Sequence, residues 1–326
     1  MSNKIALILG VTGQDGALLA QLLLNKSYTV IGQSRSAEKA NLGNLQRLNI
    51  LNKIDIKYIS LLDKAEVESL IREVSPHEVY NLSGQSSVGQ SYIAPLETAQ
   101  SHVSSTLNVL EAIRKISNAI RLFNAGSGEC FGDVKGIPAT ENTAFCPVSP
   151  YGVSKAASSW YTSVYRDSYS MYACTGIFFN HESALRTERF VTKKIAMAAY
   201  NISCGSEEKF SLGNINVIRD WGWAQDYVEA AWKMLNRQAP EDFIIATGVP
   251  QSLHAFAEAI FLEAGLELDQ YLNIDHSLFR ANEPSKIIAD ISKAKELLSW
   301  EPKFCGSEVA KKLYIDTVKA IKKGNL

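Results

Sequence analysis

The sequence predicts an α/β fold, a doubly wound parallel sheet with a smaller C-terminal lobe that is interleaved with the end of the sheet. Three observations support this prediction. Short apolar runs alternate with helical stretches through the first half of the chain, a glycine-spaced turn follows the first run, and the alternation becomes irregular after residue 170. Such alternation is typical of parallel sheets that carry helices on both faces.

Each expected element follows from its pattern, in chain order. Apolar runs predict strands at 4–10, 28–35, 77–84 and 120–127, and helical stretches are expected at 16–26, 64–74, 104–116, 189–202 and 253–266. We therefore expect residues 1–175 to form the sheet domain, with segments at roughly 215–250 returning to it. Residues 176–326 should mainly form the second lobe.

The composition excludes several classes of protein. The 326 residues are 46% hydrophobic and 21% charged with a net charge of −1, which gives no general attraction to nucleic acid or membranes. No apolar run is long enough to span a bilayer, and the first residues lack the pattern of a signal peptide. The five cysteines are scattered without a CxxC pair, so we expect free thiols in the cytoplasm and no metal site.

The turn "GVTGQDG" places Gly10, Gly13 and Gly16 between a strand and a helix. Glycines here let backbone N–H groups approach a pyrophosphate at the positive end of the helix, as in a Rossmann-type dinucleotide site, although a purely structural loop is the alternative. The next strand ends with Arg35 where NAD-binding sites usually carry an acidic residue. Arg35 favours NADP over NAD, unless it is a solvated surface charge.

The segment "SPYGVSK" places Tyr151 and Lys155 four residues apart, on one face of a helix. A nearby ammonium favours a phenolate, so we expect a lowered pKa for Tyr151. The same spacing also occurs by chance between surface residues. Ser127 and Glu129, in "NAGSGECFG", follow a predicted strand and should face the same crevice as Tyr151.

Together these residues indicate oxidation of an alcohol. Ser127 would orient the hydroxyl, Tyr151 would take its proton, and Lys155 would keep Tyr151 ionisable. Glu129 adds a carboxylate that could remove a proton next to the new ketone, so that a hydroxyl one carbon further on departs. The result is a net dehydration with the cofactor regenerated, as in a sugar 4,6-dehydratase. The alternatives for Ser127 and Glu129 are a helix cap and a solvated loop charge.

The chain resembles the GDP-mannose 4,6-dehydratase family of the extended short-chain dehydrogenase/reductase superfamily over nearly its whole length. The similarity is carried by "ILGVTGQDGALLAQLLL", "EVYNLSGQSSVGQSY", "SGECFGD", "SPYGVSKAASSW", "FNHESALRTERFVTKKI" and "LGNINVIRDWGWAQDYVEAAW". The resemblance implies tightly bound NADP, a GDP-hexose substrate of manno configuration and a 4-keto-6-deoxy product.

The resemblance also implies site residues. Glu129, Tyr151 and Lys155 match the family's catalytic residues, and Ser127 stands where the family has a catalytic Thr. The implied cofactor contacts are Gly10, Thr12, Gly13, Gln14, Asp15, Gly16, Arg35, Leu61, Leu82, Ser83, Gln85, Tyr151, Lys155, His181 and Arg186. The implied substrate contacts are Ser86, Asn180, Lys194, Arg219, Arg280 and Glu283; for each single charge among these, an ordinary surface ion pair is the alternative.

Several positions depart from the family pattern. Gly128 stands where a small polar residue is usual, Ser60 where an Asp is usual and Ala184 where a Pro is usual, and the loop after Arg35 is short. These departures indicate a divergent branch that uses either GDP-mannose or a related sugar such as a heptose. That loop reaches a neighbouring subunit in the family, so the expected homo-oligomer is either a dimer or a tetramer.

Two other functions remain open. A nucleotide-sugar epimerase or reductase would use Tyr151 and Lys155 without needing Glu129 for elimination. A cofactor-binding subunit without turnover is a second alternative, which the complete set of four catalytic residues disfavours.

Overall fold

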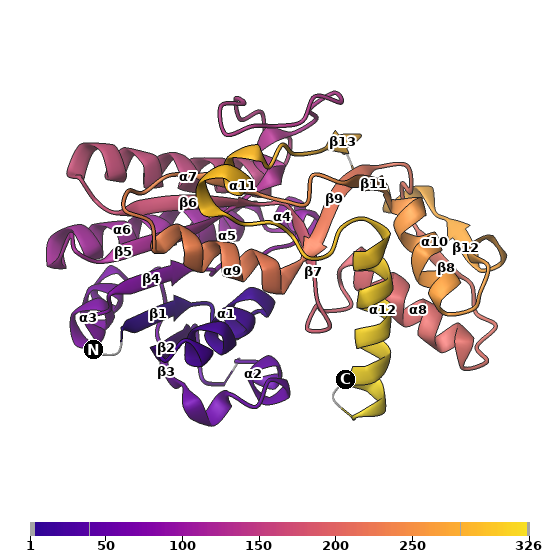
Figure 1. The fold of residues 1–326 in the computed structure, drawn as a ribbon, viewed down its shortest axis with the longest axis horizontal. Helices are drawn as coiled ribbons and strands as arrows, with labels where there is room; N and C mark the ends of the chain where they lie inside the picture. Colours follow the sequence, from indigo (N-terminus) through magenta and orange to yellow (C-terminus); the bar gives the residue numbers. More distant parts are fainter. Residues whose placement is uncertain (1–3, 39, 281, 325–326) are drawn as a thin grey trace.

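The computed structural model describes residues 4–38, 40–280 and 282–324, and its centre is a seven-stranded parallel sheet (Figure 1). The strand order is β10-β6-β5-β4-β1-β2-β3: the chain adds β2 and β3 on one side of β1 and then adds β4, β5 and β6 on the other side. This change of side is the mark of the doubly wound topology. The strands are β1 (Ile5–Leu9), β2 (Thr29–Ser34), β3 (Asp55–Tyr58), β4 (Glu78–Asn81), β5 (Arg121–Ser127), β6 (Ala173–Phe178) and β10 (Phe243–Ile245). This sheet confirms the predicted fold class.

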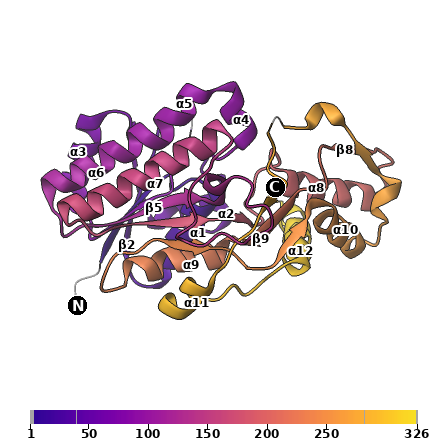
Figure 2. The same cartoon turned by 90° about the horizontal axis from the view of Figure 1, so that it is seen from above.

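Helices cover both faces of the sheet (Figure 2). On one face lie α1 (Gln14–Asn25), α9 (Ala224–Leu235) and α11 (Ser292–Leu298); on the other lie α3 (Lys64–Val74), α6 (Ser105–Ile116) and α7 (Pro150–Tyr169). Alternate residues of β1 serve the two cores, since Ala6 and Ile8 pack with α1 whereas Leu7 and Leu9 pack with α3 and α6. A strand that is buried on both sides must be apolar throughout, which explains the continuous run in the sequence.

Shorter helices shape the rim of the sheet. They are α2 (Gly43–Arg47), η1 (Leu51–Lys53), α4 (Val88–Ile93), α5 (Pro95–Ala99) and η3 (Gly128–Phe131). Between α5 and α6 the chain forms a π-helical turn, η2 (Gln100–Ser104), so that α5, η2 and α6 follow one another without a break.

The second lobe has its own core, in which α8 (Val191–Ser203), α10 (Leu253–Glu263) and α12 (Ser307–Lys322) pack together. Its small sheets contain β7 (Asn180–Glu182), β8 (Phe210–Leu212), β9 (Ile218–Trp223), β11 (Pro250–Ser252), β12 (Leu272–Ile274) and β13 (Lys286–Ile287), and η4 (Leu268–Gln270) and η5 (His276–Leu278) complete it. After α8 and β9 the chain returns to the large sheet through α9 and β10.

Three expectations from composition can be compared with the structure. All five cysteines are free. No helix in the described part of the chain is long and apolar enough to cross a membrane. Within the described ranges, no group of three or more His, Cys, Asp or Glu side chains is arranged to hold a metal ion.

Candidate active site

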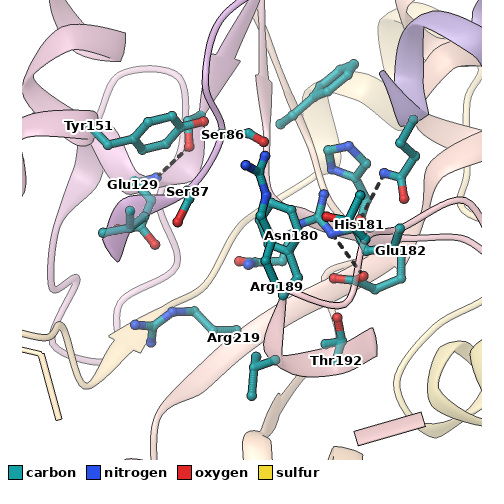
Figure 3. A pocket seen from close by; sticks show the side chains of 18 of the residues that line it. Ser86, Ser87, Glu129, Tyr151, Asn180, His181, Glu182, Arg189, Thr192 and Arg219 are labelled. Carbon is teal, nitrogen blue, oxygen red and sulfur yellow. Dashed lines mark hydrogen bonds and ion pairs between the residues drawn. The ribbon is translucent and has the colours of Figure 1, made fainter. Parts of the chain in front are cut away.

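A cavity of about 580 Å³ lies beyond the carboxyl ends of the central strands, between the large sheet and the second lobe. Figure 3 shows Glu129 and Tyr151 on one side and His181 and Glu182 on the other. The cavity brings together most of the predicted site residues: Thr12, Gly13, Gln14, Asp15, Gly16, Leu82, Ser83, Ser86, Ser127, Glu129, Tyr151, Lys155, Asn180, His181, Arg186, Lys194, Arg219, Arg280 and Glu283. These residues come from both halves of the chain.

Four predicted cofactor residues, Gly10, Arg35, Leu61 and Gln85, do not line this cavity. The Arg35 side chain is 84% exposed and lies 3.9 Å from the Glu97 carboxylate. Leu61 is buried in the core beside α3 and α6. The role of Arg35 in cofactor choice therefore stays a prediction.

The glycine turn has the geometry of a diphosphate cradle. Gly10 has a φ of +81°, which glycine adopts readily, and a Cβ on Gly16 would lie 2.7 Å from the Cα of Val11. The N-cap of α1 is Gly13, so no side chain caps the N–H groups of the first turn of this helix. The positive end of a twelve-residue helix therefore opens into the cavity.

Asp15 and His181 link this turn to the second lobe. The Nε2 atom of His181 lies 2.9 Å from the Asp15 carboxylate, and Nδ1 lies 2.7 Å from the carbonyl oxygen of Phe179. Because both ring nitrogens face acceptors, the doubly protonated imidazolium satisfies both contacts. Burial disfavours the charged form of each group, but the attraction and hydrogen bond between the two side chains outweigh this effect. The pKa of Asp15 therefore falls to about 2, and the pKa of His181 is raised.

We expect this pair to stabilise the fold only within a window of pH. Asp15 contributes above its unfolded pKa of about 3.9 and loses its contribution as pH falls toward 2; His181 contributes below about 6.5 and loses its contribution as pH rises through its higher folded pKa. Asp15→Asn should therefore lower the free energy of unfolding by about 1–2 kcal/mol near pH 5–6 and by progressively less below pH 4. Thermal unfolding across pH would measure this difference.

A matched control is the exposed His254–Asp269 pair, whose closest atoms are 3.8 Å apart and whose Asp side chain is 90% exposed. Asp269→Asn should change stability little at any pH, because solvent screens such a pair. A pH-independent effect of Asp15→Asn would contradict the ionic interpretation.

Tyr151 and Lys155 lie on the first turns of α7 and are both buried. Pro150 at the helix start and the Ser149 side chain, which accepts the N–H of Gly152 at 3.0 Å, fix where this helix begins. The Lys155 ammonium donates to the carbonyl oxygen of Ala125 at 2.8 Å and lies 5.9 Å from the centre of the Tyr151 ring.

The prediction of a lowered pKa for Tyr151 is wrong for this structure. Burial raises the pKa of Tyr151, and a hydrogen bond with Ser127 offsets only part of that rise. Burial likewise lowers the pKa of Lys155 to about 8. Spacing along a helix could not predict this result, because desolvation of both groups opposes the charged pair.

Glu129 lies on η3, two residues after the end of β5, and its backbone N–H donates to the Ser127 hydroxyl at 3.2 Å. Burial raises the pKa of Glu129, while the charges of Arg219 and Arg280 counteract part of the shift. Arg280 pairs with Glu283 at 3.7 Å, and buried Arg219 donates to the carbonyl oxygen of Ile218 at 2.9 Å. A carboxyl with a raised pKa and two arginines therefore share one side of the cavity.

Sequence reasoning missed several residues that line the cavity, among them His102, Glu182, Arg189 and Thr192. Glu182 is buried and lies 3.3 Å from the Arg186 guanidinium. The sequence signal that could have indicated Glu182 is its place beside His181 in the "FNHES" motif. His102 belongs to no motif and precedes the helix expected at 104–116, so only the fold shows that it lines the cavity.

The fold, the glycine turn, Ser127 at the end of β5 and the Tyr151–Lys155 pair at the start of α7 define a short-chain dehydrogenase/reductase of the extended type. A family profile described as GDP-mannose 4,6 dehydratase matches residues 7–313. GDP-mannose 4,6 dehydratase 1 of Arabidopsis thaliana is 42% identical over 324 residues, which cover 96% of this chain and 89% of that protein. The chain belongs to the GDP-mannose 4,6-dehydratase family.

Solved structures support the fold alone. The UDP-glucose 4-epimerase of Thermotoga maritima superposes with a TM-score of 0.85 at 22% identity, covering 98% of this chain and 99% of that one. The dTDP-glucose 4,6-dehydratase of Bacillus anthracis gives a TM-score of 0.86 at 18% identity, with 99% and 100% covered. Since an epimerase and a dehydratase fit equally well, the choice between them depends on the site.

Proposed function

We propose that this chain converts GDP-mannose, or a closely related GDP-manno-sugar, to its 4-keto-6-deoxy derivative with NADP as a recycled cofactor. Family membership supports the substrate class. The observation that carries the reaction type is half-buried Glu129, which lines one cavity with Ser127 and Tyr151. An epimerase or reductase would not need this third acid–base group for elimination.

The residues present fit a nicotinamide dinucleotide. The uncapped first turn of α1 offers N–H groups to its diphosphate, and Lys155 lies deep in the cavity, where it can bond the nicotinamide ribose. When bound there, the dinucleotide would supply reversible hydride transfer, from C4 of the sugar and later to C6.

The side chains of this chain would manage the protons. Ser127 orients the C4 hydroxyl, and Tyr151 takes its proton as the carbonyl forms. Glu129 then removes the proton at C5, which the new ketone acidifies, and delivers a proton to the departing C6 hydroxyl, so that water leaves. A double bond forms between C5 and C6. Hydride addition at C6 and protonation at C5, which uses the proton that Tyr151 took from the C4 hydroxyl, complete the product.

The second lobe supplies groups suited to a nucleotide diphosphate. Arg219 and Arg280 can contact its phosphate oxygens in a bidentate manner, and Glu283 can accept hydrogen bonds from ribose hydroxyls. Lys194, whose ammonium bonds the Ser211 carbonyl oxygen at 2.7 Å, and Asn180 complete the proposed set.

The test is to incubate the purified protein with GDP-mannose without added NADPH and to identify the product by mass spectrometry. A 4-keto-6-deoxy product supports the proposal. Epimerised sugar, or reduced sugar formed only when NADPH is added, would support the alternative enzymes instead. A panel with GDP-heptose and other nucleotide-sugars would define the preferred sugar.

We propose that Arg35 selects NADP over NAD by binding the 2′-phosphate. Arg35→Ala should weaken NADP binding about tenfold and should leave NAD binding nearly unchanged. Tenfold is at the lower end of the range for a charge-assisted hydrogen bond, because the Arg35 side chain is exposed. Titration calorimetry with both dinucleotides measures this. The exposed Arg72→Ala on α3 is the control, and equal losses for NAD and NADP would exclude the assignment.

We further propose a cytoplasmic homo-oligomer. Exposed apolar side chains gather on neighbouring α4, α5 and α7, with Ile93 at 79%, Leu96 at 80% and Trp160 at 60% exposure. A surface of this kind favours contact with a second copy of the chain. Trp160→Glu should reduce the mass measured by light scattering to that of the monomer; an unchanged mass would exclude this face.

A further inference from the structure

His102 is a buried histidine beside the proposed base, and the proposed mechanism does not use it. It lies in the π-helical turn between α5 and α6 and lines the cavity. Its ring meets the Tyr151 ring edge-on, with centroids 5.4 Å apart and an interplanar angle of 81°. Edge-to-face contacts of this kind are favourable and depend on geometry.

On its other side, His102 contacts the loop that follows β4, residues 83–87. Its Nε2 atom lies 2.7 Å from the carbonyl oxygen of Gln85, so Nε2 carries the proton and donates. Gly84, at a φ of +105°, lies so close that an added Cβ would be 2.6 Å from Nδ1. Burial and the charge of Lys155 keep the pKa of His102 well below its ordinary value, so the ring is neutral.

This loop is itself held on several sides and faces the cavity. The Gln85 side chain donates to the Thr98 hydroxyl at 3.0 Å and accepts the N–H of Ser87 at 2.8 Å. Ser86 and Ser87 line the cavity (Figure 3). His102 therefore touches Tyr151 on one side and the cavity-lining loop 83–87 on the other.

We propose that His102 is a positioning residue that couples loop 83–87 to Tyr151, so that a sugar seated against Ser86 and Ser87 meets a correctly placed phenol. This inference rests on the proposed dehydratase function and adds a residue to it. A π-helical turn displaces one residue from the regular helix, and such turns are frequent at functional sites. Here the displaced turn carries His102 toward both partners.

The test uses His102→Leu, which removes the aromatic edge and the hydrogen bond, and His102→Phe, which keeps the ring contact and removes only the bond to Gln85. We expect His102→Leu to lower kcat by about 10–100-fold, with KM for GDP-mannose and Kd for NADP changed by less than about threefold. His102→Phe should retain an intermediate kcat. A change confined to kcat distinguishes positioning from a general loss of structure.

Ser105→Ala is the matched control. Ser105 is also buried, one turn further along the same helical segment, and its hydroxyl donates to the Ser101 carbonyl oxygen at 2.6 Å. It should leave kcat within about twofold of the wild type. A wild-type kcat for His102→Leu, or for His102→Phe if the Leu variant does not fold, would overturn the proposal. An inactive wild type would instead overturn the dehydratase function.

Discussion

Replacing Tyr151 with Phe should lower the rate of C4 oxidation by about 10²–10⁴-fold, the usual contribution of a positioned general base. The reason is geometric, because Tyr151 lines the cavity together with Ser127 and no other described tyrosine does so. The variant keeps the ring, and with it the edge contact with His102. Rapid mixing with GDP-mannose, monitored through the near-ultraviolet absorbance of reduced nicotinamide, measures the step.

Tyr165→Phe is the control for this experiment. Tyr165 lies on the same helix, and its hydroxyl donates to the Glu111 carboxylate at 2.8 Å, far from the cavity. It should retain wild-type oxidation. Near-normal turnover by Tyr151→Phe would remove Tyr151 from the mechanism.

The raised pKa of Tyr151 bears on how this base works. Burial disfavours the phenolate, and Lys155 directs its ammonium to the Ala125 carbonyl oxygen. A phenolate therefore needs a further positive charge nearby, which oxidised nicotinamide carries. On this basis Tyr151 would accept the C4 proton only when cofactor and substrate are both in place.

The fold could be predicted because its elements are locally encoded. The helix expected at 64–74 has these bounds in the structure, and the glycine turn lies between β1 and α1 as expected. The short strand β3 was not predicted, since only four residues pair there and both of its end residues are exposed. Periodicity is too weak over so short a run.

The composition of the site was predicted better than its electrostatics. Ser127 and Glu129 lie where β5 ends, at the edge of the sheet at which a doubly wound fold binds ligands, and the start of α7 places Tyr151 in the same cavity. The direction of the pKa shift of Tyr151 and the position of His102 depend on burial and on loop packing. These arise only when distant segments meet, so no local pattern carries them.

Glu129→Gln should separate a dehydratase from its relatives. The amide keeps the size of the carboxylate but cannot take a proton from C5 or deliver one to the departing C6 hydroxyl. In the proposed mechanism, oxidation at C4 requires only Ser127, Tyr151 and Lys155, so the absorbance of reduced nicotinamide should appear. The 4-keto-6-deoxy product should form at least about 10²-fold more slowly than in the wild type.

The environment of Glu129 makes this test sharp. Burial raises the pKa of its carboxyl, which brings the acid and base forms closer in energy near neutral pH, while Arg219 and Arg280 limit the rise. A carboxylate base loses activity when it is protonated, so elimination in the wild type should slow at low pH. Because the amide does not titrate, Glu129→Gln should also remove this fall in rate at low pH. The exposed Glu258→Gln on α10 should change neither step. If Glu129→Gln forms product at the wild-type rate, Glu129 takes no part in elimination, and the epimerase or reductase function becomes the better explanation of the same cavity.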